Sequence, residues 1–190
     1  MLRSAGFGHV VVADGDGFEA SPLPFLVDDD LTELRMHVAR PNPIWRLAPA
    51  PAFVAMTVSD AYVSPSWYPS KAEHGKVVPT WNYEVVYVHG RLEVCDADWT
   101  AQLVRDLTDQ HERDRPDPWS VDDAPADFIA KLGQAIVGVS LEVDRIEAKR
   151  KLSQNKGDAD LAGAIAGLTA SSSDRERIVG AAMKRAGGDG

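Results

Sequence analysis

The sequence predicts a β-rich α+β protein, in which short strands form an antiparallel barrel or sandwich with flanking helices. Seven or eight short runs rich in β-branched and aromatic residues are separated by turn signals, nearly all within the first 95 residues. Many short strands joined by turns are typical of an antiparallel barrel or sandwich. After residue 96 the apolar residues recur at helical spacing instead, and one more alternating strand follows near residue 140. We therefore expect helices to cover one side of the sheet.

The first strands are predicted to form a hairpin. Two Asp-Gly pairs at residues 14–17 separate two apolar runs, and such pairs favour tight hairpin turns. Pro22 and Pro24 mark the second run as irregular or as an edge strand, because proline cannot donate to a ladder. The predicted strands of this region cover residues 7–13, 18–27 and 33–38.

Four further strands are predicted from short apolar runs and the dipeptides between them. Ser59-Asp60 and His89-Gly90 are interpreted as tight turns, because small and polar residues there interrupt the apolar pattern. The strands of this region are expected at residues 52–58, 61–64, 80–88 and 91–95.

The helices are predicted from caps and from apolar spacing. Asp96 or Asp98 caps a helix that reaches Arg113, with Trp99, Leu103 and Leu107 on its buried stripe. A second helix begins at Ala124-Pro125, a strand covers residues 137–143, and two helices cover residues 158–168 and 173–185, the last of them weakly packed. The buried face of the second helix is predicted to consist of Phe128, Ile129, Leu132 and Ile136.

Composition limits the class of protein. The chain has 190 residues and one cysteine, Cys95, so we expect no internal disulfide and a reducing compartment. No signal-peptide pattern and no long apolar stretch is evident, so we expect a cytoplasmic protein without a membrane partner. The net charge is −9 and the pI is about 5.0. Direct contact with DNA is disfavoured, because DNA binding depends on Lys and Arg.

Residues 64–83 are the most informative stretch. They contain two of the five tryptophans, and three prolines exclude a continuous helix. An ordered loop with aromatic faces, hydroxyls and the cations Lys71 and Lys76 suits a ligand that is flat at one end and anionic at the other. A structural or interface loop is the alternative, because Trp and Tyr often pack in cores and interfaces.

Two other stretches carry polar groups that could contact such a ligand. Asn42 before Pro43 predicts a helix start, and Arg40 just upstream makes an anion site as plausible as a plain cap. Residues 149–156 read KRKLSQNK and are the most basic stretch. This stretch is either a solvated charged loop or a second wall of the ligand site.

These blocks resemble the PaiB-type FMN-binding negative transcriptional regulators. The resemblance rests on HVARPNPIW at residues 37–45, the stretch at 64–83, VHG at 88–90, IVG at 136–138 and KRKLSQNK at 149–156. It implies an FMN-binding split β-barrel at residues 1–168 with inserted helices at 96–136, followed by a C-terminal helix and frayed tail at 169–190. It also implies a homodimer with flavin sites between subunits, and DNA as a partner through the family name alone.

The resemblance also implies a set of flavin-binding residues. Phosphate contacts are expected from Arg40, Lys71 and Lys151, with the backbone near Asn42 contributing. Trp67, Tyr68, Val78 and Trp81 are expected to line the slot for the ring. The polar contacts are expected from Thr80, Asn82, Ser153, Gln154 and Asn155.

The sequence departs from the family pattern at Pro22, Met36 and Pro41, where relatives tend to have histidine, glycine and alanine, respectively. An N-terminal segment of the relatives is also expected to be missing.

Three alternative functions stay open. One is an FMN-dependent oxidoreductase that uses a nicotinamide donor, with Glu73 and His74 as the sole acid–base candidates. The others are a DNA-binding repressor and a haem protein with His37, His74 or His89 as axial ligand.

Overall fold

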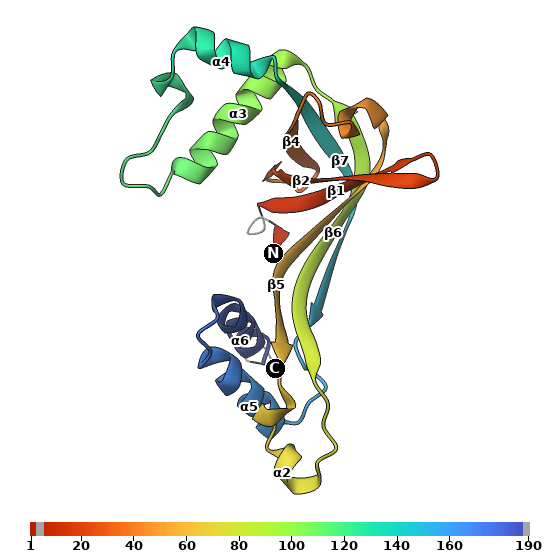
Figure 1. Cartoon of the computed structure of the whole chain (residues 1–190), viewed down its shortest axis with the longest axis vertical. Helices are drawn as coiled ribbons and strands as arrows, with labels where there is room; N and C mark the ends of the chain where they lie inside the picture. Colours follow the sequence, from red (N-terminus) through yellow and green to blue (C-terminus); the bar gives the residue numbers. More distant parts are fainter. Residues whose placement is uncertain (3–5, 188–190) are drawn as a thin grey trace. The chain divides into compact units, whose positions relative to one another are not determined.

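The structure is a computed structural model that describes residues 1–2 and 6–187. Its strands form one antiparallel sheet in the order β2-β1-β5-β6-β7-β4-β3, which confirms the predicted β-rich α+β split-barrel class with flanking helices. The strands are β1 (Phe7–Asp14), β2 (Gly17–Pro24), β3 (Leu26–Val27), β4 (Glu33–Ala39), β5 (Ala50–Val63), β6 (Thr80–Val94) and β7 (Ile136–Lys151), all labelled in Figure 1 except β3.

The longer helices α3 to α6 lie in the second half of the chain, where the sequence predicts helices, and a short helix and two 3-10 turns lie in the first half. The α-helices are α2 (Ser70–His74), α3 (Ala97–Glu112), α4 (Ala126–Gly133), α5 (Asp158–Thr169) and α6 (Asp174–Gly187), and three 3-10 turns are η1 (Ile44–Leu47), η2 (Pro65–Trp67) and η3 (Val121–Asp123). None of these helices combines the length and the apolar character needed to cross a lipid bilayer, within the part of the chain that is described.

The chain divides into two compact units. Unit 1 comprises Met1–Met56 and Tyr87–Glu147, and unit 2 comprises Thr57–Val86 and Ala148–Gly190. Each unit is thus built from two separate stretches of sequence. The frayed tail that the sequence predicts falls at residues 188–190, which lie outside the described residues.

In unit 1, the N-terminal hairpin forms as predicted. β1 and β2 pair antiparallel from Phe7↔Pro24 to Asp14↔Gly17. Gly15 in the turn has a φ of +57°, a conformation that glycine adopts without steric cost. β2 is an edge strand of the sheet, which agrees with the prolines at 22 and 24.

The core of unit 1 has buried residues on β4, β7 and α3. β4 pairs antiparallel with β7, and Leu34, Met36 and Leu141 have no exposed side-chain surface. α3 begins at the predicted cap Asp96, whose carboxylate accepts the Trp99 N–H at 2.8 Å. Its apolar stripe packs as predicted, because Leu103 and Leu107 are buried together with Leu26 and Trp99.

The two predicted tight turns within β5 and β6 are wrong. Ser59-Asp60 lies inside β5, and His89-Gly90 lies inside β6. Gly90 is needed for close strand contact, because a Cβ at this position would lie 1.9 Å from the Glu142 carbonyl oxygen. Ser59 is buried and donates to the Glu84 carboxylate at 3.1 Å, so it faces the interior of a strand. Two long strands, β5 and β6, therefore replace four predicted short ones.

The predicted buried face of the second helix is also wrong. α4 begins after Pro125 as expected, but Phe128 is 52% exposed and Leu132 is 49% exposed. Ile136 belongs to β7 and is only half buried. Helical periodicity correctly predicts that a helix forms here. It does not show whether another element covers the apolar face of that helix.

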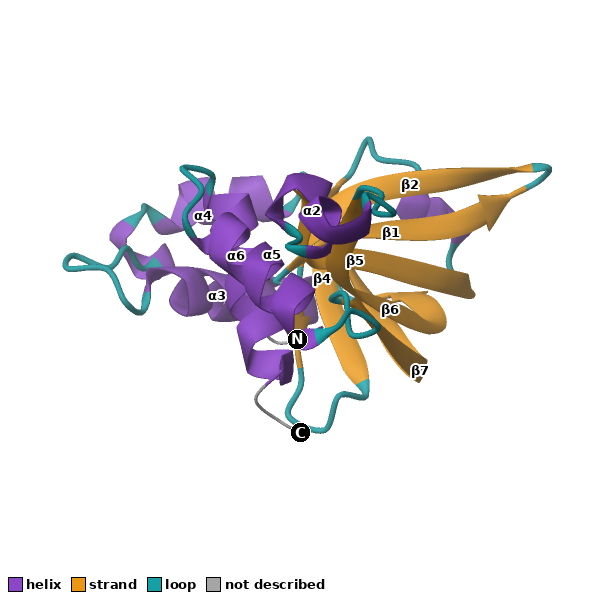
Figure 2. Ribbon diagram, turned by 90° about the horizontal axis from the view of Figure 1, so that it is seen from below, coloured by secondary structure: helices purple, strands orange, loops and turns teal. Residues whose placement is uncertain are grey.

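In unit 2, α5 and α6 pack side by side (Figure 2). Leu168, Val179 and Ala182 have no exposed surface, so the expectation of a weakly packed last helix is wrong. Glycines on α5 permit close contact, since a Cβ at Gly163 would lie 2.1 Å from the Trp67 carbonyl oxygen and one at Gly167 would lie 2.3 Å from the Trp67 ring. The small residues thus tighten this core.

One carboxylate is buried between the three long strands where they belong to unit 2. Glu84 on β6 is 3% exposed. Arg150 on β7 donates from Nε to Glu84 Oε1 at 2.8 Å, and Ser59 on β5 donates to Oε2 at 3.1 Å. Both carboxylate oxygens therefore have partners, which a buried charge requires.

Candidate functional site

The two stretches expected to form opposite walls of the ligand site meet in unit 2. Lys151, at the end of β7, donates from Nζ to the Thr80 hydroxyl at the start of β6, at 2.7 Å. The Lys156 ammonium lies 4.6 Å from the centre of the Tyr68 ring. Residues 64–83 and 149–156, which are about 70 residues or more apart in sequence, are thus neighbours in the fold.

A buried polar pair lies two residues further along each of the two segments. Asn82 is fully buried and Ser153 is 4% exposed. The Asn82 amide donates to the Ser153 hydroxyl at 3.0 Å, and this hydroxyl also lies 3.0 Å from Asn82 Oδ1. Ser153 has a φ of +62°, so the chain bends sharply at the end of β7. The pair links β6 to the segment after β7.

Trp67 and Tyr68 pack into the core of unit 2. The Trp67 ring lies against Gly167 of α5, and Tyr68 is 2% exposed. The Tyr68 hydroxyl is enclosed and makes no hydrogen bond of normal geometry with the described residues, although the Ser153 hydroxyl lies near it. Burial raises the pKa of Tyr68, and the neighbouring Ser153 hydroxyl offsets part of this effect. These two side chains stabilise the loop from within.

Other candidates are at the surface. Val78 is 70% exposed and Trp81 is 49% exposed, so both offer apolar area to a ligand. The Trp81 ring lies edge-on to Tyr62, with centroids 6.4 Å apart, and the Arg175 guanidinium lies 5.8 Å from the Trp81 centroid. Sequence reasoning missed Tyr62 and Arg175. The alternation of buried Ala61 and Val63 could have indicated that Tyr62 points outward, whereas no local signal indicates Arg175.

The polar candidates at the surface are held by local hydrogen bonds. Lys71 donates from Nζ to the Ser66 hydroxyl at 3.0 Å. Gln154 accepts the Leu152 N–H at 2.7 Å, which fixes the turn after β7, and Asn155 is exposed beside it. Neither Lys71 nor Lys151 forms an ion pair with a carboxylate in the described part of the chain. Both ammonium groups therefore remain able to bind an anion.

The aromatic stretch at residues 64–83 is more structured than the sequence predicts. The three prolines exclude a continuous helix as expected, but η2 and α2 form between them. Asp160 of α5 accepts both the Ser70 N–H at 3.1 Å and the Ser70 hydroxyl at 2.6 Å, which holds α2 at its start. His74 accepts the Lys76 N–H at 3.0 Å, so its Nδ1 is used in closing the loop.

Arg40 and Asn42 belong to unit 1. The Arg40 guanidinium donates to the Gln134 carbonyl at 2.6 Å and to the Ile136 carbonyl at 3.0 Å, and it remains exposed. Asn42 Oδ1 accepts the Ile44 N–H at 2.9 Å, and its amide donates to Ser21 at 2.7 Å. The predicted helix start is therefore a cap, but it begins only the single 3-10 turn η1.

The exposed donor set of unit 2 fits a flavin mononucleotide in its chemistry. Such a ligand requires cations for a phosphate, polar groups for a hydroxylated chain and apolar surface for a ring. Lys71 and Lys151 supply the cations, Thr80 and Asn155 supply the polar groups, and Trp81 with its neighbours supplies the apolar surface. In contrast, no three His, Cys, Asp or Glu side chains are arranged to hold a metal ion within residues 1–2 and 6–187.

The sheet order defines an antiparallel split-barrel protein, and its unit 2 presents an exposed polar and aromatic surface. Residues 1–145 match the family described as "Putative FMN-binding domain", and the chain belongs to this family. The resemblance to PaiB-type proteins is confirmed by protease synthase and sporulation protein PAI 2 of Bacillus subtilis, which is 31% identical over 164 residues, covering 84% of this chain and 77% of that protein.

Two further proteins are similar to this chain. An uncharacterised protein of Aspergillus fumigatus is 32% identical over 197 aligned positions, which cover 79% of this chain and 76% of that one. The solved structure of the FAD and heme binding protein from Mycobacterium smegmatis superimposes with a TM-score of 0.59 at 21% identity, covering 85% of this chain and 73% of that chain. At this identity the likeness shows the fold.

Proposed function

We propose that this protein is an FMN-binding homodimer whose flavin is held by the exposed surface of unit 2. The observation that carries the proposal is the contact between Lys151 and Thr80, which joins the aromatic stretch to the basic stretch. Membership of a family described by FMN binding supports the choice of ligand. Bound flavin would supply one- and two-electron redox chemistry, and the protein would bind and orient it.

Exposure separates the expected site residues into two groups. Lys71, Val78, Thr80, Trp81, Lys151, Gln154 and Asn155 are exposed or partly exposed, and we assign ligand contact to them. Trp67, Tyr68, Asn82 and Ser153 are packed or hydrogen-bonded within unit 2, and we assign them the role of holding the surface in place. Substitution of these four buried or packed residues would therefore change flavin affinity indirectly, through the stability of unit 2.

Lys151 and Lys71 are the proposed phosphate ligands in unit 2. Each ammonium has one hydrogen bond to a hydroxyl, which leaves further N–H donors for an anion. Arg40 has two of its guanidinium nitrogens bound to carbonyl oxygens, and its Nη1 retains donors, so we keep it as a phosphate ligand in the dimer. The Asn42 side chain is already paired twice, so only the backbone near it is proposed to contribute.

We infer that the regulatory role implied by the PaiB-type resemblance acts through a partner other than DNA. The inference rests on the net charge of −9, which has the wrong sign for binding phosphate backbones. A gel shift with the upstream region of its own gene at low salt tests this inference. A salt-sensitive shift would contradict it.

The central experiment is an absorption spectrum of freshly purified protein followed by titration with FMN. We expect flavin absorbance near 450 nm, or saturable binding of added FMN, and a dimeric mass by sedimentation. Lys151→Ala should raise the Kd for FMN about tenfold or more, because a hydrogen bond between charged groups contributes about 1.5–3 kcal/mol.

The matched control is Lys131→Ala, which removes an exposed lysine from α4 in unit 1. Its Kd for FMN should equal that of the unaltered protein. An absence of FMN binding by the unaltered protein, or equal loss of affinity in both variants, would contradict the proposed site. Circular dichroism of each variant establishes that it is folded.

A further inference from the structure

One side chain of α6 contacts two strands of unit 2 at the proposed flavin surface. Arg175 lies in the first turn of α6, and its Nε donates to the Asp60 carboxylate on β5 at 2.8 Å and to the Asp60 carbonyl oxygen at 3.1 Å. Its Nη2 donates to the second carboxylate oxygen of Asp60. The planar guanidinium matches the carboxylate in shape, so one residue of β5 fixes its position.

The same guanidinium lies over the indole of Trp81 on β6. Arg175 Cζ is 5.8 Å from the centroid of the Trp81 ring, within the reach of a cation–π contact. Tyr62 on β5 meets this ring edge-on, with centroids 6.4 Å apart and an interplanar angle of 74°. Trp81 is nevertheless 49% exposed, so these two contacts orient the ring and still leave apolar area for a ligand.

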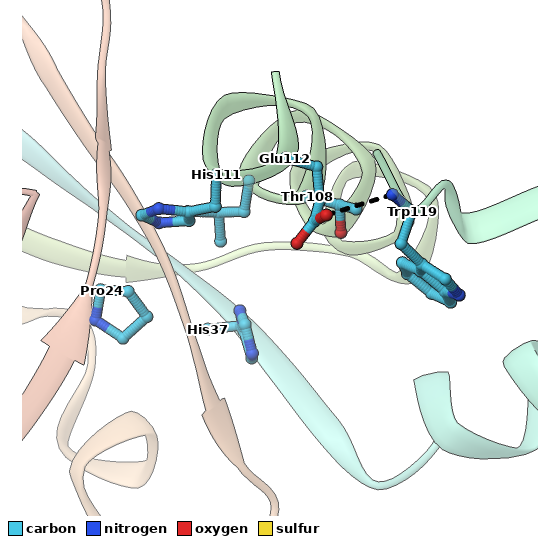
Figure 3. Close-up of a pocket in the computed structure, with 7 residues that line it drawn as sticks. Pro24, His37, Thr108, His111, Glu112 and Trp119 are labelled. Carbon is cyan, nitrogen blue, oxygen red and sulfur yellow. Dashed lines mark hydrogen bonds between the residues drawn. The ribbon is translucent and has the colours of Figure 1, made fainter. Parts of the chain in front are cut away.

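A second half-exposed tryptophan, in unit 1, lacks such contacts. Trp119 lines the open depression drawn in Figure 3 and is 45% exposed. Its backbone N–H donates to Glu112 at 3.1 Å, as the dashed line shows, whereas within the described part of the chain no cation lies over its indole and no aromatic ring packs on it. Exposure of a tryptophan does not by itself bring a clamp, and the contacts around Trp81 are particular to that ring.

A ring that is oriented before the ligand arrives binds a flat molecule more tightly than a mobile ring does. Ordering a mobile side chain opposes binding, and contacts already present in the free protein remove this cost. Arg175 is suited to this role rather than to phosphate binding, because the Asp60 carboxylate neutralises its charge. Lys71 and Lys151, in contrast, donate only to hydroxyl groups in the hydrogen bonds described above.

We propose that Arg175 is a positioning residue of the flavin site, which holds the Trp81 indole in the orientation that receives the flavin ring. The inference rests on the proposed function, because it takes Trp81 as part of the flavin surface. It extends the site to α6, which lies outside residues 1–145 that match the family. Arg175 therefore acts on the ring end of the ligand and not on its phosphate.

Titration of the full chain with FMN and with riboflavin, which lacks the phosphate, tests the proposal. Arg175→Ala should raise the Kd for both ligands by the same factor, about three- to tenfold, because the same preorganisation is lost in each case. Lys151→Ala should instead weaken FMN more than riboflavin. If Arg175→Ala weakens FMN alone, Arg175 is a phosphate ligand, and if it changes neither Kd, Trp81 needs no anchor. Either result would overturn the proposal.

The matched control is Arg177→Ala, which removes the same charge from the same helix. Arg177 donates to the Ser171 carbonyl oxygen at 2.7 Å and to the Asp174 carboxylate, so its contacts stay at the start of α6. Its Kd values for FMN and riboflavin should equal those of the unaltered protein. Equal losses in the Arg175 and Arg177 variants would attribute the effect to the charge or stability of α6 and would contradict the proposal.

A double-mutant cycle separates positioning from a merely structural role. In a Trp81→Leu background no indole is left to orient, so Arg175→Ala should cause no further loss of riboflavin affinity. A further loss as large as that in the unaltered background would mean that Arg175 acts through the stability of unit 2. If the Trp81 variant binds too weakly to titrate, the signal of the Trp81 ring itself decides.

That signal is measured by ¹⁹F NMR of the full chain labelled with 5-fluorotryptophan, without ligand. The chain has five tryptophans, and the signal lost in Trp81→Leu is that of Trp81. Arg175→Ala should shift this signal, and Arg177→Ala should not. An unchanged Trp81 signal in the Arg175 variant would overturn the inference.

The two arms distinguish the failure of this inference from the failure of the proposed function. If the unaltered protein binds neither FMN nor riboflavin, the proposed function is contradicted, together with the part of Arg175 in flavin binding. If the unaltered protein binds both and Arg175→Ala changes neither the Kd values nor the Trp81 signal, only the inference about Arg175 is contradicted.

Discussion

The helices α4 of unit 1 and α5 of unit 2 both carry regularly spaced apolar residues, but only α5 packs such residues into a core. Leu168 of α5 has no exposed surface, whereas Leu132 of α4 is 49% exposed. The difference lies in small residues. Gly163 and Gly167 let α5 approach Trp67 closely, while Gly133 on α4 has no neighbour within 4 Å. Close packing of a helix thus depends on what its glycines touch, and apolar spacing alone does not reveal it.

Truncation of one leucine in each helix should show the largest contrast. Leu168→Ala should lower the free energy of unfolding by about 3 kcal/mol, because it leaves a cavity in a filled core. Leu132→Ala should lower it by about 0.5 kcal/mol or less, because the side chain is half exposed. Urea unfolding followed by circular dichroism measures both. Similar losses in the two variants would mean that α4 is covered in solution.

Addition of one methyl group should sharpen the contrast further. Gly163→Ala should destabilise the protein by about 2 kcal/mol, since the new Cβ would lie 2.1 Å from a backbone carbonyl oxygen that cannot turn aside. Gly133→Ala should instead be neutral or stabilising by up to about 1 kcal/mol, because alanine is the better helix former. The midpoints of urea unfolding compare the two variants. A stable Gly163 variant would show that α5 can shift away from Trp67.

A smaller effect than those of the substitutions above is expected when the pH is lowered. It should arise in unit 1, because burial keeps the imidazole of His37 neutral. Its pKa is lowered in the folded state, so the unfolded chain binds the proton first as the pH falls below about 6.5. The folded state therefore loses stability on acidification. His37→Gln should lose less free energy of unfolding between pH 7.5 and 5.5 than the unaltered protein. Equal slopes would mean that His37 is solvated.

Local sequence signals predicted the elements whose cause is local. The Asp-Gly hairpin, the Asp96 cap and the alternating strand in β7 all form, because each depends on a few adjacent residues. The basic stretch and the aromatic stretch were expected to share a site, and they do meet at Lys151 and Thr80. Their roles in binding stay predictions.

Signals with a distant cause were misinterpreted. Gly90 was predicted to form a turn, but the glycine is there because the Glu142 backbone passes so close to it. Trp67 was expected to line a ligand slot, and its packing against Gly163 and Gly167, about 100 residues later, was not predicted; its role towards a ligand stays a prediction. The sequence does not show which distant segments will meet in the fold. The neighbours of Gly90 and Trp67 could therefore not be predicted from the sequence alone.

The buried Glu84 has a consequence for how the long strands align. Successive side chains of a strand point to opposite faces, so a slip of one residue in β6 would carry this carboxylate to the other face and away from Ser59 and Arg150. The carboxylate would then lose its hydrogen-bond partners, which costs free energy. An apolar side chain in its place would not impose this cost. Glu84 thus favours a single register of three strands at once, because its partners on β5 and β7 fit only that alignment.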